Sequence, residues 1–227
     1  MTPTIVAIDG PAGSGKSTVT RILAERLGWQ LLDTGSVYRA LTWYCQQQGI
    51  DLTDAEAVLA ATPAFLQVWE LSLTPGERWV RVDGIDVTDA IRATEISNQV
   101  SHVAGIMPVR AAINQRFREI LHGATAAGIV TEGRDMTTVV VPDATVRILL
   151  TADESVRIQR RQAERGNDNP EAVARSVALR DAKDGRVTNF TEAAPGVDVI
   201  DSTHMDLAAV TDAVLEIIAE RTGNGRS

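Results

Sequence analysis

The stretch GPAGSGKS, residues 10–17, decides how the rest of the chain is interpreted. It fits the pattern G-x-x-x-x-G-K-[ST] of the phosphate-binding loop. A β-branched run over residues 4–8 precedes it, and apolar residues follow at helical spacing: Val19, Ile22, Leu23 and Leu27. The loop is therefore expected between a buried strand and a helix, as its mechanism requires. A glycine-rich turn that matches by chance is the alternative, and this context argues against it.

Each residue type in this loop has a chemical use. Glycines at positions 10, 13 and 15 let backbone N–H groups turn inward around oxyanions at a helix N-terminus. Lys16 can reach the β- and γ-phosphates of a nucleotide, and the Ser17 hydroxyl can ligate Mg²⁺. The loop therefore predicts a nucleoside triphosphate site.

Composition limits the class of protein. The 227 residues, 44% of them hydrophobic, suit one domain with appendages or two small domains. The net charge of −8 argues against a binder of nucleic-acid polymers, which would show a basic face. The single cysteine, Cys45, allows no internal disulfide and is interpreted as a core thiol. Without an evident signal peptide or membrane span, we expect a cytoplasmic protein with no membrane partner.

The order of the expected elements predicts an α/β protein. After the loop helix, residues 29–32 are typical of a second strand, and helices are expected over 37–48 and 55–61. Residues 65–73 and 79–82 then alternate in β fashion around a Pro-Gly turn. This pattern predicts a small antiparallel insert.

The second half returns to an α/β pattern. Residues 93–127 are helical, and Pro108 is expected to divide them into two helices. Strands are expected over 128–131 and 197–201, and a last amphipathic helix over 207–218.

Polar residues gather where two of the expected strands end. Residues that could donate to a phosphate follow the second strand: Thr34, Ser36, Tyr38 and Arg39. Taken in isolation, they are better explained as a helix cap followed by a surface helix. The charged sequence EGRD, residues 132–135, follows the strand over 128–131. Open α/β sheets bind ligands at such strand ends, although an ordinary βα turn is the alternative.

Residues 153–186 are polar and rich in arginine, with two helical halves separated by a break at 166–170. Charge-rich helices are usually solvated faces. Beside a phosphate-binding loop, we interpret this segment as a mobile lid that shields the transferring phosphoryl group from water.

A phosphate-binding loop alone is compatible with a kinase, a GTPase or a motor ATPase. The guanine-reading string N-K-x-D of a GTPase does not occur, and a motor would normally carry a much larger machine. A second polar site and an arginine lid on a small chain favour phosphoryl transfer between two bound small molecules.

Four motifs resemble those of bacterial cytidylate kinases, a branch of the nucleoside monophosphate kinases. They are IDGPAGSGKS, LLDTGSVYR, EGRDM and RDAKD, in the same order and spacing along nearly the whole chain. The resemblance implies a P-loop kinase core with a parallel sheet flanked by helices, a small antiparallel β insert and a helical lid. It implies a (d)CMP kinase of pyrimidine metabolism that phosphorylates CMP or dCMP, with ATP as donor and Mg²⁺ as cofactor. We expect nucleotides as its partners and a monomer as its state.

This architecture divides the chain into five expected segments. The core would comprise residues 1–62, 93–152 and 187–227. The β insert that binds the nucleoside monophosphate would span 63–92, and the arginine-rich lid 153–186.

The resemblance also implies roles in donor binding and catalysis. The ATP phosphates would be held by Gly10, Gly13, Ser14, Gly15, Lys16, Ser17, Thr18 and Arg157. The residues expected to act in catalysis are Lys16, Arg134, Arg180 and Arg186. Mg²⁺ would be held by Ser17 and by Asp33 through its water shell, although Asp33 could serve as a helix cap instead.

For the acceptor, the resemblance implies three groups of contacts. The CMP phosphate would be bound by Thr34, Tyr38, Arg39 and Arg134. Arg180 and Asp184 would contact the ribose, and Ser101, Arg110 and Asp135 would read cytosine. The last assignment suits the base, because Asp135 and Ser101 can accept from its amino group while Arg110 donates to N3 and O2.

Two positions depart from the family pattern. Thr137 stands where the family usually has glycine, and the lid arginine, Arg186, comes one residue early. Two other functions stay open: a kinase of another acceptor, which a substrate panel would reveal, and a non-catalytic nucleotide-binding module, which would form no ADP.

Overall fold

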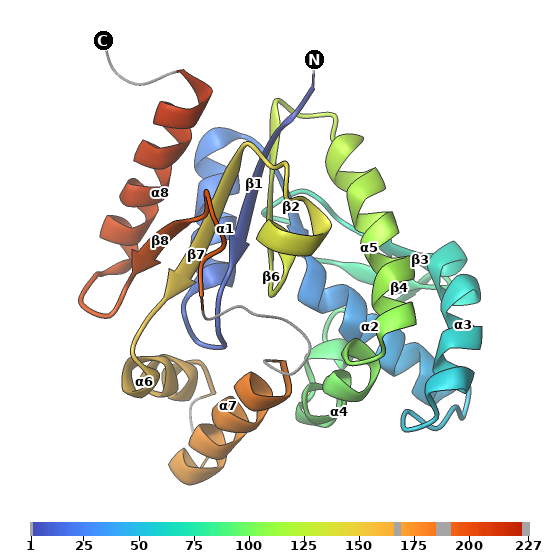
Figure 1. Ribbon diagram of the computed structural model, residues 1–227. Helices are drawn as coiled ribbons and strands as arrows, with labels where there is room; N and C mark the ends of the chain where they lie inside the picture. Colours follow the sequence, from blue (N-terminus) through green and yellow to red (C-terminus); the bar gives the residue numbers. More distant parts are fainter. Residues whose placement is uncertain (1, 166–168, 185–191, 224–227) are drawn as a thin grey trace.

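The computed structural model describes residues 2–165, 169–184 and 192–223. Its core is a five-stranded parallel sheet in the order β2-β6-β1-β7-β8 (Figure 1). The strands are β1 (Thr4–Asp9), β2 (Gln30–Asp33), β6 (Gly128–Gly133), β7 (Val146–Thr151) and β8 (Asp198–Asp201). Because they are parallel, their carboxyl ends share one edge, and β1 brings the phosphate-binding loop to the middle of it.

Helices cover both faces of this sheet (Figure 1). Helices α1 (Lys16–Leu27) and α8 (Leu207–Thr222) pack on one face, and α2 (Thr34–Gln47) and α5 (Met107–His122) on the other. Alternate side chains of β1 enter the two apolar clusters, with Val6 and Ile8 under α1 and α8. Cys45 is fully buried in the other cluster, as expected, and burial raises its pKa to about 11. The expected α/β class and parallel core are confirmed.

Helix α3 (Ala55–Val68) is longer than predicted. The prediction of β structure from residue 65 was wrong, because the helix continues through Pro63 and strand β3 comprises only Trp69–Leu71. Phe65 is fully buried, with its ring 5.7 Å from that of Tyr44 in α2. We attribute the longer helix to this packing, which offsets the hydrogen bond lost at the proline. The expected insert boundary at residue 63 thus falls inside α3.

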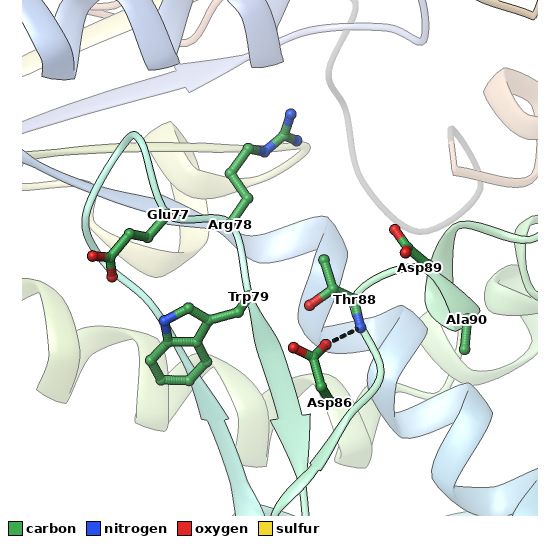
Figure 2. Close-up of a pocket in the computed structure, with 7 residues that line it drawn as sticks. All are labelled: Glu77, Arg78, Trp79, Asp86, Thr88, Asp89 and Ala90. Atoms are coloured by element: carbon green, nitrogen blue, oxygen red, sulfur yellow. Dashed lines mark hydrogen bonds between the residues drawn. The ribbon is translucent and has the colours of Figure 1, made fainter.

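Strand β3 forms a small antiparallel sheet with β4 (Val80–Val82) and β5 (Ile85–Asp86). Asp83 and Gly84 have φ values of 52° and 73°, so a two-residue turn with two left-handed positions joins β4 to β5. Figure 2 shows a hollow on this sheet, lined by Glu77, Arg78, Trp79, Asp86, Thr88, Asp89 and Ala90. The predicted hairpin is present.

The remaining helices start and end near the predicted positions. A 3-10 turn, η1 (Ala90–Arg92), precedes α4 (Thr94–Ala104), and Pro108 lies in the first turn of α5, where a missing N–H is tolerated. The two halves of the expected lid are α6 (Glu154–Arg165) and α7 (Pro170–Asp184), below the sheet in Figure 1. None of the helices in the described ranges is both long and apolar enough to cross a membrane.

Candidate active site

The loop after β1 forms a cradle at the start of α1. Gly10 and Gly13 have φ values of 150° and 78°, and a Cβ there would lie 2.0 Å from the Leu150 carbonyl oxygen and 2.5 Å from that of Arg157. A Cβ at Gly15, by contrast, would meet no heavy atom within 4 Å. Gly15 is also the N-cap of α1 and supplies no capping side chain. An uncapped helix N-terminus beside open space suits a bound phosphate.

Two polar side chains of the loop, Lys16 and Ser14, are buried and therefore shielded from water. Lys16 donates from Nζ to the Pro11 carbonyl oxygen at 2.9 Å. Burial lowers its pKa to about 7, and the positive charge of Arg134 acts in the same direction. The Ser14 hydroxyl oxygen is buried and has no hydrogen-bond partner among the described residues. Both groups would gain from an oxyanion placed in the cradle.

Carboxylates beside the loop are compatible with a magnesium site. Glu132, near the end of β6, accepts a hydrogen bond from the Ser17 side chain. Burial and the charge of Asp33 raise the pKa of Glu132 to about 7, while Lys16 and Ser17 oppose the shift. No three His, Cys, Asp or Glu side chains form a ligand cluster in the part of the chain that the structure describes. Mg²⁺ in phosphoryl-transfer sites needs only one or two protein ligands besides phosphates and water.

The junction after β2 forms a helix cap. Asp33 accepts a hydrogen bond from the Ser36 N–H at 3.2 Å, so α2 begins at Thr34 and not at Val37 as predicted. The Thr34 hydroxyl donates to the Glu132 carbonyl oxygen at 2.6 Å. Thr34 and Asp33 therefore lie beside the loop, but each has a structural contact in addition to its expected role.

Two further residues of α2 contact neighbouring helical segments. The Tyr38 hydroxyl donates to Asn114 Oδ1 at 3.4 Å. Arg39 donates to Ser97 Oγ at 2.7 Å and to the Ile91 carbonyl oxygen at 3.2 Å. These contacts place Arg39 against η1 and α4.

The residues expected to read cytosine form a buried ion pair. Arg110 of α5 donates to the Asp135 carboxylate, and their side chains are only 9% and 10% exposed. The guanidinium also lies 5.5 Å from the centre of the Tyr38 ring and donates to the Ala104 carbonyl oxygen at 3.1 Å. Ser101, half-buried, lies three residues before Ala104 on α4. The structure thus brings Arg110, Asp135 and Tyr38 together.

Two arginines converge on one carboxylate of the expected lid. Asp181 of α7 accepts from the Ala12 N–H at 3.2 Å through Oδ1, which lies 3.9 Å from Arg134 Nη2. Its Oδ2 accepts from Arg157 of α6 at 2.5 Å, and the same arginine donates to the Ala12 carbonyl oxygen at 3.0 Å. Arg134 also donates to the Gly10 carbonyl oxygen. The lid, the loop and the end of β6 therefore meet at Asp181.

Three candidates cannot be placed. Arg180 and Asp184 belong to α7, but their side chains lie outside the described part of the structure. Arg186 lies outside the described residues altogether.

Three buried or half-buried carboxylates were not among the predicted site residues: Asp9, Glu132 and Asp181. Each lies inside one of the four motifs, and two of them, Asp9 and Asp181, directly adjoin residues that received a role. A carboxylate at a strand end, or next to an arginine in a lid, was the available signal.

The hollow in Figure 2 is separate from this site, although one of its residues is linked to it. The Arg78 guanidinium is turned away from Asp86 and Asp89. Its positive charge lowers the pKa of Glu132. The small sheet therefore contributes a charge to the surroundings of the loop.

Comparisons with known proteins agree with the motifs. A family model described as cytidylate kinase matches residues 6–220. A cytidylate kinase from Cutibacterium acnes is 46% identical over 219 residues, which cover 95% of this chain and 96% of that protein. One from Lactiplantibacillus plantarum is 39% identical over 224 residues, 95% of each chain. The crystal structure of a gluconokinase from Sinorhizobium meliloti shares the fold, with a TM-score of 0.50 and 15% identity, covering 98% of this chain and 95% of its own. The chain belongs to the cytidylate kinase family.

Proposed function

We propose that the chain transfers the γ-phosphoryl group of ATP to CMP or dCMP, giving ADP and CDP or dCDP. The observation that carries this proposal is the buried pair of Arg110 and Asp135, at the edge of the sheet that also holds the phosphate-binding loop. A donor cradle and a polar base site on one edge suit direct transfer between two bound nucleotides.

The donor would lie in the cradle between β1 and α1. Its phosphates would be held by the loop N–H groups and by Gly10, Gly13, Ser14, Gly15, Lys16, Ser17, Thr18 and Arg157. Ser17 and Asp33 would hold Mg²⁺, which supplies positive charge to the β- and γ-phosphates when bound. The unpartnered Ser14 hydroxyl and the buried Lys16 support this assignment.

The acceptor would lie between α2, α4 and the end of β6. Asp135 and Ser101 would accept from the cytosine amino group, and Arg110 would donate to the ring acceptors. The phosphate would be bound by Thr34, Tyr38, Arg39 and Arg134, for which Arg39 would exchange its contacts with Ser97 and Ile91. Arg180 and Asp184 would contact the ribose, and Arg186 would supply a positive charge from the lid.

The reaction forms a bond between a CMP phosphate oxygen and the γ-phosphorus, and breaks the bond to the β,γ-bridging oxygen of ATP. The attacking oxygen is already anionic at neutral pH, so no side chain need act as a strong base. Lys16 and Arg134 would stabilise the charge that spreads over the transferring group, the usual source of catalysis in such sites. We further propose that the enzyme acts as a monomer in the cytoplasm.

A coupled assay of ADP formation tests this function. With ATP and Mg²⁺, CMP and dCMP should give much higher kcat/KM than UMP, AMP or GMP. Asp135→Ala should raise the KM for CMP strongly and leave that for ATP almost unchanged, because the base site loses an acceptor. Faster turnover of another acceptor would indicate a kinase of different specificity. An absence of ADP with every acceptor would indicate a binding module.

A further inference from the structure

The carboxylate of Asp9 has no part in the mechanism above, although it ends β1 and directly precedes Gly10. It is 2% exposed. Its Oδ1 accepts from the Met136 N–H at 2.9 Å, and its Oδ2 accepts from both the N–H and the hydroxyl of Thr137, each at 2.7 Å. One buried carboxylate thus takes three hydrogen bonds from two consecutive residues.

These bonds hold the backbone that follows Asp135. Residues Met136–Val140 form a π-helical turn, and the Asp135 carbonyl oxygen accepts from the Val139 and Val140 N–H groups. On the preceding side, Arg134 donates to the Gly10 carbonyl oxygen. The chain is therefore tied to residues 9 and 10 on both sides of Asp135.

The three donors suit the carboxyl group of Asp9. Burial raises its pKa, and the hydrogen bonds from Thr137 and Met136 oppose that shift. An aspartate offers lone pairs on both oxygens, whereas an asparagine would turn an NH₂ group toward at least one N–H. Thr137 is itself buried, so its hydroxyl has little access to water as an alternative partner. The hydrogen bonds to Asp9 therefore hold residues 136 and 137 in place, and hydrogen bonds to water cannot replace them in this buried position.

We propose that Asp9 and Thr137 are positioning residues that aim Asp135 at the base of the acceptor nucleotide. This inference rests on the proposed reading of cytosine by Asp135. Because the Asp135 side chain also pairs with Arg110, a rotation of its backbone would misplace both base contacts together. Removal of the support therefore weakens discrimination between bases, beyond any loss of stability.

Thr137→Val is the matched test, because it keeps the side-chain shape and removes the hydroxyl donor. The readout is the ratio of kcat/KM for CMP to that for UMP, which a change in the fraction of folded enzyme leaves unaltered. We expect this ratio to fall about 5- to 20-fold, as the loss of one buried partner implies. Thr137→Ser keeps the donor and should keep the ratio.

Two further variants separate the explanations. Thr62→Val removes another fully buried threonine hydroxyl, which donates to the Val58 carbonyl oxygen at 2.8 Å in α3. It should lower the melting temperature without changing the ratio. Asp135→Asn should reduce the ratio at least as much as Thr137→Val.

The outcomes distinguish this inference from the function on which it rests. A reduced ratio in Asp135→Asn with an unchanged ratio in Thr137→Val would overturn the positioning role and leave the base reading intact. An unchanged ratio in Asp135→Asn would overturn the base reading, and the positioning role with it. If Thr137→Val is too unstable to assay, Thr137→Ala at low temperature gives the same comparison.

Discussion

Among single residues, Lys16 has a pKa that its surroundings lower strongly. Burial and Arg134 lower its pKa from 10.5 to about 7, although Glu132, Asp9 and Asp181 oppose the shift. Because a lowered pKa favours the neutral form of an amine, Lys16 of the ligand-free protein is mostly neutral between pH 7 and pH 10.5. A bound triphosphate brings negative charge to the ammonium and raises the pKa again.

We therefore predict that binding of Mg²⁺-ATP at pH 8 takes up close to one proton per site. Glu132, whose pKa is raised only to about 7, is already largely ionised at this pH and adds little. Calorimetric titration in buffers of different ionisation enthalpy measures the uptake directly. Lys16→Met should abolish it. An absence of proton uptake by the unaltered chain would show that Lys16 is charged before the nucleotide arrives.

Among the elements, α7 rests on the phosphate-binding loop through Asp181. This carboxylate accepts from the Ala12 N–H and pairs with Arg157, and both groups face the region proposed for the ATP phosphates. In the ligand-free protein it makes contacts of the kind that a phosphate oxygen would make. Asp181 and a bound phosphate are then competitors for the same donors.

Asp181→Ala should accordingly strengthen the binding of ADP, by about 3- to 10-fold, because the competent loop no longer has to displace a carboxylate. Fluorescence or calorimetric titration with ADP measures the change. Glu171→Ala is the matched control, since it removes an exposed negative charge from the first turn of the same helix. Weaker binding of ADP by Asp181→Ala would mean that the carboxylate supports the nucleotide-bound loop.

The elements also show what the sequence could and could not predict. The phosphate-binding loop, its strand and its helix are local, so pattern and glycine positions were sufficient to predict them. Residues 65–68 were misassigned because Phe65 is buried against Tyr44 of α2, the preceding helix, and a local pattern does not reveal this contact. The same holds for the site. The family resemblance located Arg110 and Asp135, but their pairing, and that of Asp9 with Thr137, depends on the tertiary structure.

At the scale of the molecule, α6 and α7 join the two sides of the proposed site. Through Asp181, α7 contacts the loop, and it also packs against α4, the helix that carries Ser101 (Figure 1). Its buried side chains include Val173 and Val177, which belong to neither of the two apolar clusters of the central sheet. In this arrangement α7 connects the phosphate-binding loop to α4.

This arrangement predicts how the chain responds when both nucleotide sites are filled. Amide hydrogen exchange over 154–165 and 170–184 should be faster than over β1 and β6 in the free protein, because few of the described side chains of α6 and α7 are buried apolar groups. A bisubstrate inhibitor that joins adenosine and cytidine through phosphates should slow exchange in α6 and α7 and leave the strands unchanged, since the arginines then bind phosphate. Asp181→Ala should speed exchange of α7 in the free protein but not in the complex. If the inhibitor leaves exchange in both helices unaltered, α6 and α7 are a fixed cover and the lid interpretation is wrong.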